Sequence, residues 1–281
     1  MQQLVLPRSA GGVLAACDTG PTGRSDEVVV LWHGGTPSTG EPPAPLLAAA
    51  SGLGLRFSGA DRPGCGGTTR DSGATISDVV PDVLAVADAV GAERFAVLGH
   101  SGGGPRVLAC SALVPERMSA AVAVASPAPA HAEGLDRCAG MAVGVVREQR
   151  AAARGRSALT DVLEHGEFDE DAFTPAIGPR SRGRGGGWAR TWQSRSRRGW
   201  RRRRTTCSPP PGPGASTSRR SHPGGSSCTA TRTGWCRRPT AGGCTHVPGP
   251  DLRPVRGAGH LDALHGVRPV LEALRRRALA V

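Results

Sequence analysis

The residues best suited to chemistry lie together in one stretch, Gly99-His100-Ser101-Gly102-Gly103. A Gly-X-Ser-X-Gly pattern between a strand and a helix is typical of a nucleophile elbow, in which the serine lies on a sharp, strained turn that lifts its hydroxyl clear of the sheet. We expect glycine at 99 and 103 because a Cβ two residues before or after the serine would collide with neighbouring backbone. The pattern therefore predicts nucleophilic catalysis by Ser101.

A histidine near the end of the chain is the candidate base. A serine hydroxyl is a weak nucleophile at neutral pH and needs a base to take its proton, and the pKa of histidine lies close to the working pH. His260 follows a Gly-Ala-Gly turn, which favours a loop position from which an imidazole could reach Ser101. By itself His260 would be interpreted as a surface histidine. His33 and His100 are interpreted as structural and packing residues.

The stretch around Ser101 lies between elements that could position it. The apolar run Arg94–Leu98 predicts a strand before it, and Gly104–Leu113 predicts a helix whose N-terminal N–H groups would face a developing oxyanion. Other strands and helices alternate along the chain, which favours an α/β fold with a parallel sheet. These are strands at Glu27–Trp32, Leu53–Phe57 and Ala120–Ala125, and helices at Leu46–Ala50 and Ser77–Val90.

Four motifs in this order resemble those of the α/β-hydrolases, in their serine-esterase and proline-iminopeptidase-like branch. They are His33-Gly34-Gly35, Asp61-Arg62-Pro63-Gly64-Cys65-Gly66, Gly99-His100-Ser101-Gly102-Gly103 and Gly257-Ala258-Gly259-His260. The resemblance, over about residues 10–175 and 249–281, implies a mostly parallel sheet with helices on both faces. It also implies a Ser–acid–His enzyme with Ser101 as nucleophile and His260 as base.

The resemblance assigns further parts of the site. The backbone N–H groups of Gly35 and Gly102 would form the oxyanion hole, and the turn from Asp61 to Gly66 would be structural. No cofactor and no metal are expected, and the expected partner is a small acyl substrate.

Composition divides the chain into four parts. We expect the core with the elbow at 1–129, a helical lid at 130–177, an arginine-rich segment at 178–248, and the C-terminal core with the His260 loop at 249–281. The segment at 178–248 holds 16 of the 35 arginines and has no acidic residue, leucine or isoleucine. Such a composition predicts disorder, disrupting the sheet.

The third member of the triad is missing for the same reason. The resemblance places an acid after a strand within 178–248, where the sequence has none. Regrouping GC-rich codons for Ser227–Arg237 by one base gives Val-His-Gly-Asp-Ala-Asp-Arg-Met-Val-Pro, the expected strand end, with the acid encoded across Arg232 and Thr233. We therefore interpret 178–248 as a frame-shifted translation, and expect the chain as written to be inactive or impaired.

Charge and composition exclude several classes of protein. The net charge of +12 arises in the arginine-rich segment, because the rest carries 19 arginines against 23 acidic residues. We therefore expect no specific nucleic-acid binding. We expect no secretory signal and no membrane-spanning segment, because no basic start followed by a long apolar stretch and no apolar run of sufficient length is apparent. Eight cysteines without a CxxC pair favour a reduced, cytoplasmic chain.

Three alternatives remain open at this point. The arginine-rich segment could bind a polyanion. A metal could bind the irregularly spaced Cys207, Cys228, Cys236, Cys244 and His246. The chain could also be a non-catalytic hydrolase-like binding protein.

Overall fold

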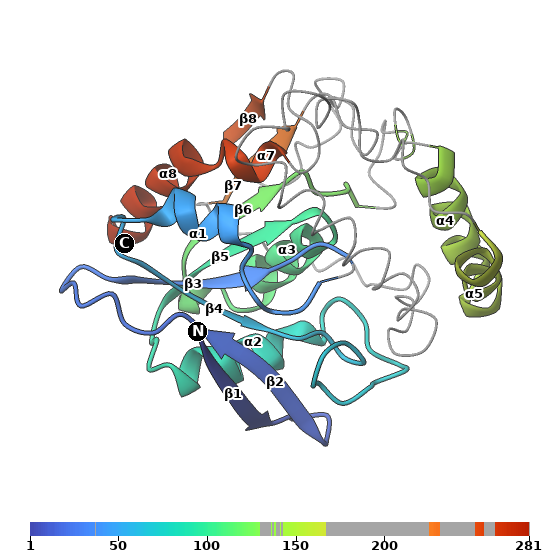
Figure 1. The fold of residues 1–281 in the computed structure, drawn as a ribbon, viewed down its shortest axis with the longest axis horizontal. Helices are drawn as coiled ribbons and strands as arrows, with labels where there is room; N and C mark the ends of the chain where they lie inside the picture. Colours follow the sequence, from blue (N-terminus) through green and yellow to red (C-terminus); the bar gives the residue numbers. More distant parts are fainter. Residues whose placement is uncertain are drawn as a thin grey trace.

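In the computed structural model, eight strands form one sheet in the order β1-β2-β4-β3-β5-β6-β7-β8 (Figure 1). The structure describes residues 1–36, 38–129, 136, 138, 141, 143–166 and 262–280, and the strands at 225–230 and 251–255. The strands are β1 (Gln2–Pro7), β2 (Val13–Asp18), β3 (Val28–His33), β4 (Leu55–Ala60), β5 (Phe95–His100), β6 (Met118–Val124), β7 (Gly225–Ala230) and β8 (Asp251–Val255). The α-helices are α1 (Ala44–Ala50), α2 (Val79–Ala89), α3 (Gly104–Leu113), α4 (Val143–Arg154), α5 (Arg156–His165), α7 (Asp262–His265) and α8 (Arg268–Leu279).

Most of the sheet is parallel. All neighbouring pairs from β4 to β8 run in the same direction, whereas β1 pairs with β2, and β2 with β4, in antiparallel fashion. The predicted strands and helices up to β6 are confirmed, with bounds that differ by a few residues. The β1–β2 hairpin is an addition to the prediction. The expected α/β class with a mostly parallel sheet is therefore confirmed.

Helices cover both faces of the sheet. Successive strand residues point to opposite sides, so an apolar strand needs a covering layer on each face. Val30 and Trp32 of β3 pack in one cluster with α1, α7 and α8. Leu31, between them, packs in a second cluster with α2 and α3. The central strands are therefore buried on both sides, which explains why they are almost wholly apolar.

The end of the chain returns to the core formed by its beginning. Leu271 and Leu274 of α8 are fully buried in the same cluster as β3 and β5. In addition, Arg268 Nη1 donates hydrogen bonds to the carbonyl oxygens of Ala49, at 3.0 Å, and Ser51, at 3.1 Å. Figure 1 shows α8 beside α1 accordingly. Residues on the C-terminal side of the arginine-rich segment thus complete one face of the sheet.

Two expectations about the chain need correction. Strand β7, Gly225–Ala230, lies inside the segment 178–248 and pairs in parallel with β6 and β8, so the prediction of disorder is wrong for these six residues. Backbone hydrogen bonding alone extends a sheet without apolar side chains. The rest of the segment lies outside the described residues. Cys65 is disulfide-bonded, whereas Cys17, Cys110 and Cys138 are free thiols, so the expectation of a reduced chain does not hold at Cys65.

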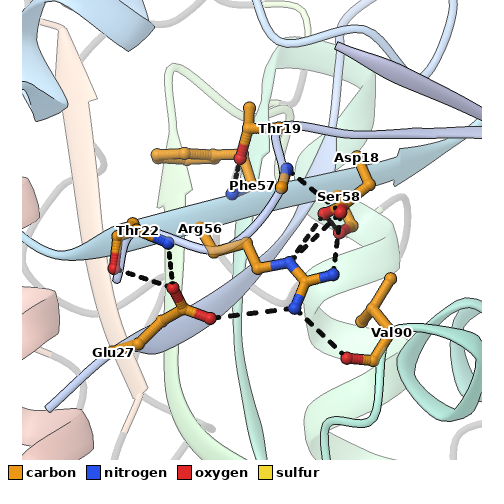
Figure 2. Close-up of polar contacts among 9 residues, drawn as sticks. Asp18, Thr19, Thr22, Glu27, Arg56, Phe57, Ser58 and Val90 are labelled. Carbon is orange, nitrogen blue, oxygen red and sulfur yellow. Dashed lines mark hydrogen bonds and ion pairs between the residues drawn. The ribbon is translucent and has the colours of Figure 1, made fainter. Parts of the chain in front are cut away.

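A polar network fixes the amino-terminal edge of the parallel strands (Figure 2). Arg56 of β4 donates to Asp18 of β2 at 2.8 Å and to the carbonyl oxygen of Val90 at 3.3 Å, and Ser58 Oγ donates to Asp18 at 2.6 Å. Burial alone would raise the pKa of Asp18, but the hydrogen bonds from Arg56 and Ser58 outweigh it and hold that pKa below its ordinary value. The network ties the antiparallel strand β2 and the end of α2 to the sheet.

Helices α4 and α5 form a small unit within the predicted lid, 130–177. Ala151, Leu159 and Leu163 are buried against one another between the two helices. Arg156 Nη2 donates to the carbonyl oxygen of Ser72, at 2.6 Å, in the loop before α2. The predicted helices of this region are present, whereas a lid function stays a prediction.

Candidate active site

The predicted site residues converge at the carboxyl edge of the sheet because β3 and β5 are parallel neighbours. His33 at the end of β3 is opposite Gly99 near the end of β5. The turns that follow the two strands therefore leave the sheet side by side, although 66 residues separate them in the chain. In open α/β sheets this edge is where ligands bind.

Ser101 lies on a strained turn. Its φ is 53°, and Ala125, which follows β6, has a φ of 48°; among the described residues these are the two non-glycine positions with positive φ. Both directly follow neighbouring strands. Backbone strain of this kind costs about 1–3 kcal/mol per residue and is concentrated at functional sites. A short 3₁₀ turn, Ser101–Gly103, then leads into α3, whose positive end faces the serine.

The glycines on either side of Ser101 are required by close backbone contacts, as the sequence predicted. A Cβ on Gly99 would lie 2.6 Å from Val107 Cγ2 and 2.7 Å from the carbonyl oxygen of Gly103. A Cβ on Gly103 would overlap the carbonyl group of His33, with its carbon at 2.7 Å. A larger residue at either position would force the turn and β3 apart.

Gly35 and Gly102, the expected oxyanion donors, both lie beside the serine turn. A Cβ on Gly35 would be 2.9 Å from Ser101 Cβ and 3.4 Å from Ser101 Oγ, and a Cβ on Gly102 would be 3.0 Å from Thr36 Oγ1. The two glycine turns are thus in contact, with the Ser101 side chain next to Gly35. The Ser101 side chain is itself buried, at 3% exposure.

Two arginines that the sequence analysis did not single out contact these turns. Arg62 donates to the carbonyl oxygens of Gly34 and Gly35 and to Thr36 Oγ1. Arg106 of α3 donates to the carbonyl oxygen of Gly102 at 2.7 Å. Burial lowers the pKa of Arg106 to about 10, so the guanidinium still carries its charge near neutral pH. No sequence pattern marks an arginine that will donate to a distant turn, so only the folded chain reveals these contacts.

His33 is buried and neutral. Burial, followed by the charges of Arg106 and Arg62, lowers its pKa to about 3. Its Nε2 has no hydrogen-bond partner in the part of the chain that the structure describes. His100 is also buried, at the end of β5. This burial agrees with the interpretation of His33 as a structural residue and of His100 as a packing residue.

The expected base and the place where the triad acid was expected lie outside the described residues. This holds for His260, for Arg232 and Thr233, and for Cys207, Cys236, Cys244 and His246 of the candidate metal site; Cys228 lies in β7, where only the backbone is described. No helix in the described ranges is both long and apolar enough to cross a membrane.

Two clefts are found at the opposite edge of the sheet. They have volumes of about 390 and 470 Å³, and both are lined by Gly91, Ala92 and Glu93, just before β5. The larger one also contacts Glu27 and Arg56, at the starts of β3 and β4. Because Ser101 follows the other end of β5, neither cleft belongs to the candidate site.

Comparison with known proteins agrees with this architecture. Residues 27–154 match the family model described as alpha/beta hydrolase fold. No curated protein matches the chain in sequence. Among solved structures, the proline iminopeptidase of Mycobacterium smegmatis superposes with a TM-score of 0.63 at 19% identity, covering 99% of both chains. Naproxen esterase from Bacillus subtilis gives 0.63 at 14% identity, over 98% of this chain and 90% of that chain.

A third similar structure is a proline iminopeptidase-related protein from Thermus thermophilus, with a TM-score of 0.60 at 20% identity over 100% of this chain and 98% of that one. The chain therefore has the α/β-hydrolase fold. The resemblance to this family, expected from four short motifs, is confirmed.

Proposed function

We propose that this protein is a serine hydrolase that cleaves a small ester, thioester or amide through an acyl-enzyme on Ser101. The observation that carries the proposal is the position of Ser101 at positive φ, between β5 and α3, with its side chain against Gly35. The fold and the esterase and peptidase neighbours support the same class of reaction.

In the proposed mechanism, His260 takes the proton of Ser101 Oγ as the oxygen attacks the acyl carbon. The bond to the leaving group then breaks, and the same imidazole returns the proton to the leaving group. The N–H groups of Gly35 and Gly102 stabilise the negative charge on the acyl oxygen. In the second half-reaction His260 takes a proton from water as the water oxygen attacks the acyl carbon. The bond between the acyl carbon and Ser101 Oγ then breaks, the imidazole returns the proton to Oγ, and the free acid leaves.

The proposal includes impaired turnover for the chain as written. No acid occupies the position expected near Arg232 and Thr233 in the sequence. In serine proteases, neutralising the acid of the triad lowers turnover about 10⁴-fold, because the imidazole is no longer held in the right tautomer. An activated ester, which needs less help from the base, is therefore the appropriate substrate.

Hydrolysis of p-nitrophenyl acetate by wild type and Ser101→Ala tests the proposal. We expect slow turnover that Ser101→Ala abolishes, and a fluorophosphonate probe that adds its mass to the wild type alone. Ser111→Ala is the matched control, because this serine lies within α3, away from the turn, and donates to the carbonyl oxygen of Val107 at 2.9 Å. Equal rates in wild type and Ser101→Ala would refute the serine mechanism and favour a non-catalytic protein with a hydrolase fold.

A further inference from the structure

Arg62 lies in the turn after β4, a turn that is itself held firmly. The carboxylate of Asp61 accepts hydrogen bonds from the N–H groups of Gly40, at 2.8 Å, and Gly67, at 2.9 Å. Both oxygens of Asp61 are thereby used to fix the backbone around the turn. These hydrogen bonds fix the backbone from which the side chain of the adjacent residue, Arg62, extends.

The guanidinium of Arg62 binds three consecutive residues of the turn after β3. Its Nη2 donates to the carbonyl oxygens of Gly34 and Gly35, the latter at 2.6 Å, and its Nη1 donates to Thr36 Oγ1 at 2.9 Å. Arginine suits this arrangement because its planar fork offers several donors with fixed geometry. A lysine ammonium is a compact charge without this planar fork, so it would not hold three acceptors in the same geometry.

These contacts fix the direction of a particular N–H group. The carbonyl of Gly34 and the N–H of Gly35 belong to one planar peptide unit, in which they point in opposite directions. A hydrogen bond from Arg62 to the Gly34 oxygen therefore aims the Gly35 N–H away from the guanidinium. The neighbouring carbonyl, that of Gly35, is held from two sides, by Arg62 and by Ser38 Oγ.

The turn needs such a constraint because of its glycines. A Cβ at position 35 would come within 2.9 Å of Ser101 Cβ, so a side chain there would displace the serine. Glycine solves this steric problem but is the residue with the greatest backbone freedom. Without external hydrogen bonds, the Gly34–Gly35 peptide could rotate, which would change the direction of the Gly35 N–H.

We propose that Arg62 is a positioning residue for the oxyanion site: by holding the Gly34 and Gly35 carbonyls and the Thr36 hydroxyl, it directs the Gly35 N–H toward the group bound at Ser101. This inference rests on the proposed function. It assigns a role in catalysis to a turn that the family resemblance describes only as structural. The charge of Arg62 also reaches the end of β3, where it contributes to the lowered pKa of His33.

The test combines a measurement at Gly35 with a measurement of turnover. In Arg62→Gln we expect the ¹⁵N order parameter of the Gly35 amide to fall from about 0.85 to below about 0.6. We expect kcat for p-nitrophenyl acetate to fall about 10²-fold, the usual effect of losing one oxyanion donor, with KM nearly unchanged. Arg62→Lys keeps the charge but not the fork, so it should resemble Arg62→Gln. Arg70→Gln, at an exposed arginine nearby, is the control.

The outcomes separate this inference from the proposed function. Unchanged Gly35 order in Arg62→Gln overturns the inference, whatever happens to turnover. Lost order with Ser101-dependent turnover intact overturns the catalytic role. If both Arg62 variants fail to fold, the arginine is structural and the inference is wrong. If Ser101→Ala leaves turnover unchanged, the proposed function fails, and a loss of Gly35 order then shows only a structural clamp.

Discussion

His33 should make the protein sensitive to mild acid, because the folded state keeps this side chain neutral. The side chain is 6% exposed, and its pKa is lowered to about 3 by burial and by the charges of Arg106 and Arg62. In the unfolded chain the same imidazole takes up a proton near pH 6.5. Lowering the pH therefore stabilises the unfolded state first.

The size of the effect follows from the two pKa values. Stability is lost from about pH 6.5 downward at about 1.4 kcal/mol per pH unit. The loss reaches about 3 kcal/mol at pH 4.5 and levels off near pH 3, where the folded state also takes up the proton. A loss of this size is a large part of the roughly 5–15 kcal/mol of a typical domain.

Urea unfolding of wild type and His33→Gln between pH 7 and 4.5 measures the loss of stability that His33 causes. We expect the free energy of unfolding of the wild type to fall by about 3 kcal/mol more than that of the variant over this range. His165→Gln is the control, because it makes the same substitution at an exposed imidazole, in α5. Histidine ¹³Cε1 resonances give a second measurement, in which the His33 signal should not titrate between pH 5 and 8.

Two results would refute the reasoning. One is an identical pH dependence of stability in wild type and His33→Gln. The other is a His33 resonance that titrates with a midpoint near 6.5. If His33 stays neutral, any limb of a pH–rate profile between pH 5 and 8 belongs to another group, as the proposed role of His260 requires.

The remaining predictions concern packing, the buried ion pair and the arginine-rich segment. Gly103→Ala should destabilise the fold by about 1–3 kcal/mol in thermal unfolding, because its Cβ meets backbone that cannot yield, whereas Gly73→Ala meets only an ordinary contact at 3.8 Å. Leu271→Ala should cost about 2–5 kcal/mol, because it leaves a cavity under α8; a cost near zero would show that α8 is not part of the core. Asp18→Asn should cost about 3–5 kcal/mol at pH 7 by leaving Arg56 without its buried carboxylate. Since the pKa of Asp18 is lowered by folding, the wild type should lose this stabilisation only below about pH 4, and the variant should lack that dependence in acid titration. A gene with the reading frame restored over 178–248 should encode an enzyme with p-nitrophenyl acetate turnover up to about 10⁴-fold higher, and equal turnover would contradict the missing-acid interpretation.

Much of the fold could be predicted because its cause is local. Strands β3, β5 and β6 are short apolar runs, and α2 and α3 repeat apolar residues at helical spacing, so each pattern reflects burial that the residue itself requires. The hairpin β1–β2 was not predicted, since β1 is half exposed and its pairing depends on a partner strand. Strand β7 was not predicted, since composition indicated disorder there, whereas its parallel pairing with β6 uses backbone groups that composition does not reveal.

The amino-acid sequence by itself determined the chemical character of the candidate site. It placed a serine between glycines after an apolar strand, and the steric need for those glycines was predictable from the missing Cβ atoms alone. The tertiary structure decided which distant groups meet that serine. Gly35 lies against Ser101 because β3 and β5 are parallel neighbours in register, and Arg62 reaches the Gly34 and Gly35 carbonyls because β4 lies on the other side of β3. Such contacts depend on strand order, which no local pattern of residues specifies.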